Sequence, residues 1–260
     1  MTVAQITDLH VRRRGHVLHH MPHVVQPLRR ALATITALPH RPRCIVATGD
    51  LTEGGSPEEY WRLREIIEGT PVPIYLIPGN HDRRDPLRQV FNDHAYLQAH
   101  GEAVLFTIEL PAVRVIALDT SEGKRHGGYL DRSRLRWLDE ALRRRSDVPT
   151  ILAMHHPPFP TGVRKFDAQP FEGRDALAAL VSAHPQIARI ICGHVHQHLM
   201  RPWCGTLGVA APSTAPTLVL RPHAPGLSRE PGGLLLHRCE NGGITTTLVR
   251  TASTPVSMSA

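Results

Sequence analysis

The chain has 260 residues, of which 41% are hydrophobic, so it is long and apolar enough to bury a substantial core. This composition excludes a disordered chain, a collagen-like repeat and a small disulfide-stabilised protein. Thirty Lys and Arg residues against twenty-three Asp and Glu give a net charge of +7, and all but two of the cations are arginine.

The N-terminal segment predicts a strand and not a targeting signal. Residues 1–7 lack the basic start and the apolar stretch of a secretory signal peptide. No run of about 18 uninterrupted apolar residues occurs, which argues against a membrane-spanning helix. The cysteines match no metal or redox spacing and predict buried thiols in a reducing compartment: Cys44, Cys192, Cys204 and Cys239. We therefore expect a cytoplasmic protein.

Short apolar runs alternate with helical patterns as far as residue 192. The strands predicted there are Thr2–Thr7, Cys44–Thr48, Ile74–Ile77, a hairpin of Ala103–Leu110 and Val113–Leu118, then Thr150–Met154 and Arg189–Cys192. The helices predicted between them are Val24–Ala37, Pro57–Glu68, Pro86–Phe91, Leu130–Arg144 and Arg174–Ala183. This βαβ rhythm predicts a sheet covered by helices. Beyond it only strands are predicted: Leu199–Trp203, Thr206–Ala210, Thr217–Leu220, Gly233–Arg238 and Ile244–Arg250.

The pattern contains no linker that would separate two domains, so residues 1–250 are predicted to form a single domain. Three segments carry Gly, Pro or His without a stable period and are predicted to form the rim of a pocket: 15–26, 122–128 and 157–173. The uncharged tail 251–260 is rich in Ser and Thr and is predicted to be disordered.

Polar motifs follow five of the predicted strands. They are Asp8-Leu9-His10, Gly49-Asp50, Gly79-Asn80-His81-Asp82, Met154-His155-His156 and Gly193-His194-Val195-His196. Because the carboxyl ends of strands line the ligand crevice of an α/β sheet, we expect these motifs at one edge. Residues i and i+2 of an extended backbone point to the same side, which would align Asp8 with His10 and His194 with His196.

The types of these side chains predict a metal centre. Eighteen histidines outnumber the Phe, Tyr and Trp residues together, and histidine is the commonest metal ligand. Carboxylate, amide and imidazole donors suit hard or borderline divalent ions, and no thiolate is offered for a structural zinc site. Seven such donors exceed the needs of one ion. They suit two ions roughly 3.5–4 Å apart, the spacing used to clamp both oxygens of a phosphoryl displacement.

The motifs D-x-H, G-D, G-N-H-D, H-H-P-P and G-H-x-H, in this order, resemble those of the calcineurin-like metallophosphoesterase superfamily. More narrowly, the chain is similar to the bacterial branch with glycerophosphodiesterases and class III cyclic-nucleotide phosphodiesterases. The runs Asp8–Gly15 and Pro78–Asp82 favour the glycerophosphodiesterases. The resemblance extends from Thr2 to about His196 and implies an α/β fold, a four-layer αββα sandwich of two mixed sheets. A homo-oligomer is the family's habit and is expected here.

The resemblance also implies which residues hold the metals and act on the substrate. The first ion would be held by Asp8, His10 and His196, the second by Asn80, His155 and His194, with Asp50 bridging the two. Two divalent ions are implied, and Mn, Fe, Zn or Co all suit these donors. A hydroxide bridging the ions would attack phosphorus in line. The neighbouring His81 would steady the phosphoryl oxygens or protonate the leaving alkoxide.

Residues next to these motifs are assigned supporting roles. Glu53 and Asp82 are candidates to orient the histidines. His156 precedes two prolines and is expected to shape a turn, and Asp119 is expected to brace a loop. His198 either shares a face with His196 or begins the next strand.

Two further groups lie near the predicted pocket. The cluster Arg12–Arg14 follows the first motif and could face an anionic substrate. A glycerophosphodiesterase would be expected to have a histidine within 211–216, where this chain has none, and His223 lies further on. Four rim histidines could read the leaving alcohol instead, or simply be solvated: His16, His19, His20 and His23.

The predicted function is hydrolysis of small phosphodiesters, with glycerophosphodiesters as the first choice and 3′,5′-cyclic nucleotides as the alternative. A nuclease would explain the positive charge, but no aromatic stacking motif accompanies the arginines. A non-catalytic scaffold on the same fold would be expected to have lost ligands, and all seven are present. The expected partner is thus a small phosphodiester, and neither a nucleic acid nor a membrane.

Overall fold

The computed structural model describes residues 1–15, 24–99, 101–123, 125–215, 218–219, 226–227, 232–240 and 242–251. Two mixed sheets contain nearly all of its strands. The first has the order β13-β12-β1-β2-β3 and the second the order β4-β5-β6-β7-β9-β8, while β10 and β11 pair separately. The rim histidines 16–23, His223 and the tail beyond residue 251 lie outside the described residues.

The strands of the first sheet are β1 (Thr2–Ile6), β2 (Cys44–Thr48), β3 (Ile74–Ile77), β12 (Gly233–Glu240) and β13 (Gly243–Arg250). Those of the second are β4 (Leu105–Glu109), β5 (Arg114–Leu118), β6 (Thr150–Ala153), β7 (Ile187–Cys192), β8 (Leu199–Trp203) and β9 (Thr206–Ala210). The small pair is β10 (Leu218–Val219) with β11 (Gly226–Leu227). The helices are α1 (Val25–Thr36), α2 (Pro57–Ile67), α3 (Arg84–Val90), α4 (Ala95–Gln98), α5 (Arg132–Arg144), α6 (Arg164–Asp167) and α7 (Arg174–Ala183).

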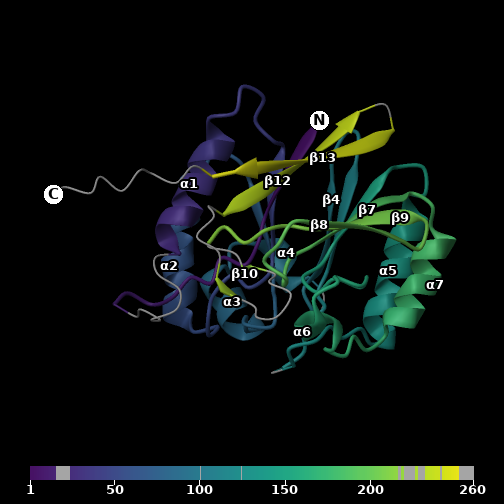
Figure 1. The fold of residues 1–260 in the computed structure, drawn as a ribbon, viewed down its shortest axis with the longest axis horizontal. Coiled ribbons are helices and arrows are strands. Elements are labelled where there is room, and N and C mark those ends of the chain that lie inside the picture. The colour runs from purple at the N-terminus through teal and green to yellow at the C-terminus, as the bar shows by residue number, and fades with distance from the viewer. Residues whose placement is uncertain are drawn as a thin grey trace.

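The side chains of β5 show how the layers are stacked. Val115 and Ala117 join the core that contains β1, β2, α1 and α2. Ile116 and Leu118, which alternate with them, join a second core with α5 and α7. Because alternate residues of a strand point to opposite faces, the second sheet lies between the first sheet and α5 with α7. Figure 1 shows α1 and α2 on one side of the strands and α5 and α7 on the other.

The predicted four-layer α/β sandwich of two mixed sheets is therefore confirmed. Strands β1, β2 and β3 run parallel, and so do β5, β6 and β7. Every strand predicted among the described residues exists, with each end within two residues of its expected bound. The short helices α4 and α6 and the strand β11 were not predicted, because a single turn of helix or a two-residue strand leaves no periodic pattern.

A buried polar network joins the two sheets below the ends of β1, β2 and β7. The Gln5 side-chain amide donates to Thr48 Oγ1 and to the carbonyl of Cys192, both at 2.9 Å. Its Oε1 accepts from His237 Nε2 at 3.0 Å, and His237 Nδ1 lies 3.0 Å from Thr246 Oγ1. Burial, with the nearby Arg189 and His198, lowers the pKa of His237 to about 3. This imidazole is therefore neutral in the folded protein at neutral pH.

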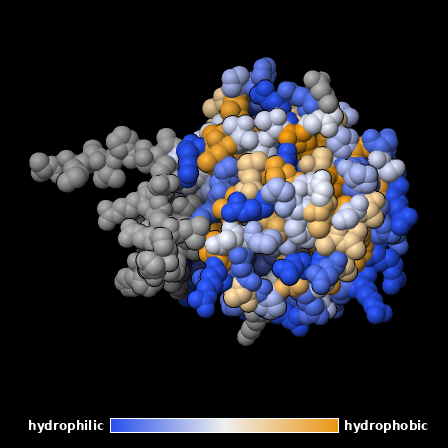
Figure 2. Space-filling model, turned by 45° about the vertical axis from the view of Figure 1, so that its right-hand side comes forward, coloured by the Kyte–Doolittle hydropathy of each residue, from blue (hydrophilic) through white to orange (hydrophobic). Residues whose placement is uncertain are grey.

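The surface has few large exposed apolar side chains. Among the described residues these are Trp61 and Met200. Figure 2 shows hydrophilic and hydrophobic residues mixed over the face in view, outside the grey region. None of the described helices is long and apolar enough to span a membrane. The predicted homo-oligomer stays a prediction.

We predict that His237 lowers the free energy of unfolding as the pH falls below about 6.5. Its pKa is about 3 in the folded chain and 6.5 ordinarily, so between these values the unfolded chain binds one proton more. The stabilisation is complete above pH 6.5 and is lost as pH falls toward 3, at up to about 1.4 kcal/mol per pH unit. In urea unfolding at pH 7, 5.5 and 4.5, the difference in free energy of unfolding between wild type and His237→Asn should shrink as pH falls. The exposed His40→Asn is the control, and a constant difference for His237→Asn would contradict the prediction.

Candidate metal centre

Five of the predicted metal ligands adopt a left-handed backbone. The φ angles lie between 44° and 70° for Asp8, His10, Asp50, His194 and His196. Of the described residues other than glycine, only Cys204 shares this feature. Such conformations cost about 1–3 kcal/mol each and concentrate at functional sites. The expectation that extended backbone aligns Asp8 with His10 and His194 with His196 is wrong. All four residues are left-handed, and the residues between them, Leu9 and Val195, are fully buried.

Hydrogen bonds between loops hold these strained residues in place. Asp8 N donates to the carbonyl of Gly49 at 3.0 Å, and His10 N donates to that of Asp50 at 2.9 Å. The loops after β1 and β2 therefore continue side by side beyond the sheet. The Asp8 carboxylate accepts from His194 N at 3.1 Å, and Asp50 Oδ1 accepts from His81 N at 3.0 Å. Each carboxylate thus fixes, through a backbone hydrogen bond, a loop that carries another predicted site residue.

Glycines beside the ligands leave room for this crowding. A Cβ on Gly79 would lie 2.2 Å from Asp50 Oδ1 and 2.9 Å from His155 Cε1. A Cβ on Gly49, which also has a φ of +99°, would lie 2.3 Å from His155 Nδ1. Gly49 and Gly79 are therefore required, because Asp50 and His155 pack too closely against them to leave room for a side chain.

The residues predicted for the first ion converge at the ends of β1, β2 and β7. Candidate ligand atoms of Asp8, His10, Asp50 and His196 all lie within 4.8 Å of one another. His196 Nε2 is 3.2 Å from Asp8 Oδ1 and also 3.2 Å from His10 Nε2. His10 Nε2 is 3.7 Å from Asp50 Oδ2. The four side chains are packed closely enough to share one cation.

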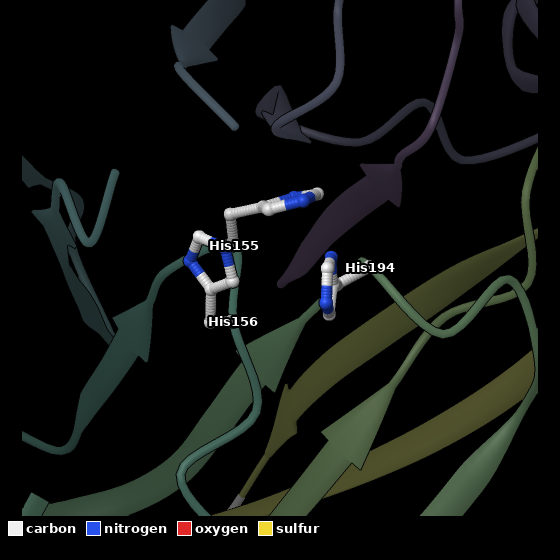
Figure 3. A group of neighbouring side chains, drawn as sticks. All are labelled: His155, His156 and His194. Carbon is white, nitrogen blue, oxygen red and sulfur yellow. The ribbon is translucent and has the colours of Figure 1, made fainter. Parts of the chain in front are cut away.

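The residues predicted for the second ion lie on the other side of Asp50. His155 Nε2 is 3.3 Å from Asp50 Oδ1 and 3.2 Å from Asn80 Oδ1. The ring of His194 lies 5.1 Å from that of His155, centroid to centroid. Figure 3 shows His155 and His156 pointing in different directions from adjacent positions after β6, with His194 across from both. Asp50 thus lies between the two groups of donors, as a bridging ligand would.

A hydrogen bond fixes which ring nitrogen of His155 carries the proton, and the second ring nitrogen of His10 lies beside a carboxylate. His155 Nδ1 lies 2.8 Å from the carbonyl of Thr48, which can only accept, so Nδ1 is the protonated nitrogen. His10 Nδ1 lies 3.1 Å from Glu53 Oε2. In both rings the Nε2 atom is left to face the cluster, and the role expected for Glu53 agrees with its contact to His10.

Asp8 and Asp50 are buried carboxylates whose ion-pair partners in the described part of the chain are all histidines. Asp8 and Asp50 are 0% and 2% exposed. Within the described residues their ion-pair partners are His196 for Asp8, and His10 with His155 for Asp50. Burial would raise the pKa of Asp50, but His155, His10 and His81 outweigh it and lower that pKa well below its ordinary value. Divalent cations fit this donor set, because they would neutralise both carboxylates and take up the facing imidazole nitrogens.

His81 lies beside the cluster with one ring nitrogen held. Its Nδ1 lies 2.9 Å from the carbonyl of Glu53, so Nδ1 donates and Nε2 is the nitrogen that remains for a ligand. The ring packs edge-on against His10 at 4.9 Å and is about one-third exposed. Glu53 thus contacts both His10 and His81. Partial burial would raise the pKa of Glu53, but the nearby His10, His81 and Arg12 lower it to about 2. The carboxyl group of Glu53 is therefore ionised.

Among the described residues, the partners of Asp82 do not include a histidine, contrary to its expected role. Its carboxylate accepts from the backbone of Leu51, Thr52 and Gly79, and from the hydroxyls of Thr52 and Tyr60. It therefore joins the loops after β2 and β3, which carry Asp50 and Asn80. Burial and the nearby Asp50 raise its pKa to about 6.

The arginines after the first motif do not share one environment, and their contact with an anionic substrate stays a prediction. Arg12 is buried and lies 3.4 Å from Glu53, and Arg14 pairs with Glu65 at the surface. Asp119 braces a loop as expected, since it accepts from Arg84, Val104 and Ser121.

His156 contacts Thr120, as a residue that shapes a loop would. Its Nδ1 lies 2.8 Å from Thr120 Oγ1, and its ring lies 4.7 Å from that of His194. Its imidazole could also hold an ion together with His155 and His194, because candidate ligand atoms of the three lie within 4.8 Å of one another.

The rim segment 157–173 reaches the site through side chains that the sequence did not single out. Lys165, Phe166 and Gln169 line the same cavity, of about 440 Å³, as His10, Asp50 and His194. The Phe166 ring lies 5.0 Å from that of His194. Gln169 Oε1 lies 2.8 Å from His194 Nε2. Gly and Pro content predicted a rim here, but no sequence signal distinguished Gln169 from its neighbours.

Comparison with protein families finds a match to the model of the calcineurin-like phosphoesterases over residues 1–198. A probable glycerophosphodiester phosphodiesterase of Arcobacter nitrofigilis is 33% identical over 252 residues, 95% of this chain and 92% of that protein. The 3′,5′-cyclic adenosine monophosphate phosphodiesterase of Escherichia coli K12 is 28% identical over 255 residues, 97% of this chain and 90% of that protein. The match to the family model includes every residue predicted to hold a metal.

Solved structures with the same fold include a dimetal phosphatase from Danio rerio. It has a TM-score of 0.66 at 13% identity, and the superposition covers 96% of this chain and 99% of the other. A purple acid phosphatase from yellow lupin has a TM-score of 0.70 at 13% identity, over 96% of this chain and 51% of the other. At this identity the likeness concerns the fold alone.

We predict that Gly79→Ala impairs the metal centre without unfolding the protein. The added Cβ would collide with Asp50 and His155, whereas a Cβ on Gly243 meets nothing closer than 3.7 Å. Equilibrium dialysis against Mn²⁺ should show affinity reduced at least about tenfold in Gly79→Ala and unchanged in Gly243→Ala. Equal binding by the two variants would show that the packing around Asp50 and His155 tolerates the methyl group.

Proposed function

Because the chain belongs to the calcineurin-like phosphoesterase family, we propose that it is a metal-dependent hydrolase of small phosphodiesters, with glycerophosphodiesters as its first substrate class. The observation that carries this proposal is the convergence of carboxylate, amide and imidazole donors on both sides of Asp50. A relative named for this activity, alike over nearly the whole chain, supports the substrate class.

The proposed centre holds two divalent ions, with Asp50 between them. Asp8, His10 and His196 would hold the first, and the second would be held by Asn80, His155 and His194. When bound, the ions would supply an activated water and neutralise charge on the phosphoryl oxygens. Mn, Fe, Zn and Co all suit these donors, so the residues do not select one of them.

The space around His81 suits a phosphate with two ester substituents. Two cavities meet there, one of about 440 Å³ over the metal centre and one of about 1070 Å³ beyond it. They share Glu53, Asn80, His81 and His126 in their linings. A diester bound at the centre could therefore place one substituent in each cavity. A monoester would fill only one of them.

His81 is suited to protonate the leaving alkoxide. The carbonyl of Glu53 holds its Nδ1–H, so an imidazolium there would present its second proton from Nε2. The carboxylate of Glu53 lies 3.9 Å from the same nitrogen, Nδ1, so the ring is held on that side and Nε2 faces away from it. Since His81 lies outside the two donor groups around Asp50, its loss would leave metal binding intact.

The alternative substrate class is 3′,5′-cyclic nucleotides. The Escherichia coli relative carries this activity in its name, and a Synechococcus relative, 34% identical over 222 residues, is named a probable cyclic nucleotide phosphodiesterase. In a cyclic diester the leaving oxygen stays attached to the product. Cleavage would then need less room beyond His81 than a glycerophosphodiester does.

A comparison of substrates tests the proposal. We expect higher kcat/KM for glycerophosphoethanolamine than for cyclic AMP, and higher for bis-p-nitrophenyl phosphate than for p-nitrophenyl phosphate, with Mn, Co, Zn or Fe supplied. Asp50→Asn should bind fewer than two ions and lose at least about 100-fold in kcat/KM, because the shared ligand is weakened. The exposed Asp147→Asn is the control. Normal turnover by Asp50→Asn would refute the binuclear site, and preference for cyclic AMP would select the alternative.

A second prediction concerns the leaving group. His81→Ala should keep its ions and lose about 10²–10⁴-fold in kcat for diesters with alkyl leaving groups. The loss should be much smaller for p-nitrophenyl leaving groups, which depart without a proton. Parallel kinetics on both classes and metal analysis of the purified variant provide the measurement. Equal losses on the two classes would remove the acid role from His81.

A further inference from the structure

The metal-facing histidines differ in where the partner of their second ring nitrogen comes from. For His10 and His155 that partner belongs to β2 or the loop after it: the carboxylate of Glu53 and the carbonyl of Thr48. For His194 it is Gln169, on the rim segment between α6 and α7. Gln169 thus gives the rim a hydrogen bond to a predicted ligand.

This contact determines the tautomer of His194. Gln169 Oε1 is a carbonyl oxygen and can only accept, so the proton of the neutral ring lies on Nε2, 2.8 Å away. The lone pair then lies on Nδ1. His194 would therefore bind through the opposite nitrogen from His10 and His155, whose Nε2 atoms face the centre.

The rim segment holds Gln169 in place from both sides. On one side, the carboxylate of Asp167 accepts from Thr161 N and Oγ1 and from Gly162 N at 2.7–2.9 Å. On the other, Glu172 N donates to the carbonyl of Gly128, and the carbonyl of Glu172 accepts from Leu130 N. Gln169 N also donates to the carbonyl of Phe166 at 3.0 Å. The half-buried amide is thus presented by an ordered loop.

Phe166 limits the movement of the same imidazole. Its ring meets that of His194 edge to face, with centroids 5.0 Å apart and planes at 68°. The hydrogen bond to Gln169 and this ring contact restrict both the rotation and the protonation of His194. Neither residue belongs to the motifs at the strand ends.

We propose that Gln169 is a positioning residue for the second ion, which keeps the proton of His194 on Nε2 and leaves Nδ1 to bind the metal. This inference rests on the proposed function, since it assigns His194 to that ion. Partners of this kind typically change metal affinity by about 10–100-fold when removed. The rim that borders the substrate cavity therefore also sets the affinity for the second ion.

Two variants of Gln169 separate the hydrogen bond from the bulk of the side chain. Gln169→Leu removes the acceptor, and Gln169→Glu keeps it. Calorimetric titration of the whole protein with Mn²⁺ should show the first ion unchanged and the second bound about 10–100-fold more weakly in Gln169→Leu. Gln169→Glu should bind within a few-fold of wild type, and so should the control Gln89→Leu, an exposed position on α3.

A second measurement does not depend on metal or activity. Long-range ¹H–¹⁵N correlation spectra of the metal-free protein should show His194 protonated on Nε2 in wild type, and a shift toward Nδ1 in Gln169→Leu. An unchanged tautomer, or wild-type affinity for the second ion in Gln169→Leu, would overturn the inference while leaving the proposed function standing. Fewer than two ions in wild type would refute the binuclear site, and the spectra would then still decide the role of Gln169.

Discussion

The buried negative charge of Asp8 and Asp50 is the constraint on which the rest of the site depends. A carboxylate removed from water must be paired and hydrogen-bonded, or it costs several kcal/mol. Here each carboxylate accepts a backbone N–H from a loop that carries another donor, from His194 for Asp8 and from His81 for Asp50. The charges that would bind metal therefore also assemble the loops around it.

The strained backbone at the strand ends follows from the same requirement. Short motifs must turn donors from separate strands toward a common point. In a pleated strand, residues i and i+2 share a face but lie roughly 6.6 Å apart along it, so they do not converge. The left-handed residues Asp8 and His10 do so while the intervening Leu9 stays in the core. The carboxylate of Asp82, with five hydrogen-bond donors around it, offsets part of this cost by joining the loops that carry Asp50 and Asn80.

Much of the fold and the donor set can be predicted from the sequence, because both leave local signals. Apolar runs predict the strands, and the order of the polar motifs predicts which residues meet at their ends. The left-handed turns could not be predicted, since Asp and His carry no requirement for positive φ as glycine often does. The carboxylate partners of Arg12 and Arg14 could not be predicted for a related reason. Arginine also braces loops, as Arg84 and Arg134 do with carbonyls and carboxylates, and composition does not distinguish these uses.

The predicted ligands differ in whether their hydrogen-bonding partners lie near the sheet or on the rim segment 157–173. Donors at the strand ends are fixed by the core, so His10 and His155 keep their partners on or beside β2 whatever the rim does. His194 differs, because its partner Gln169 lies on the loop that also borders the substrate cavity. Substitutions in the rim that admit a different leaving alcohol would then also change the hydrogen bond between Gln169 and His194. Under the proposed assignment, substrate range and occupancy of the second ion would be coupled through the hydrogen bond between Gln169 and His194. The first ion would depend on the sheets and their connecting loops.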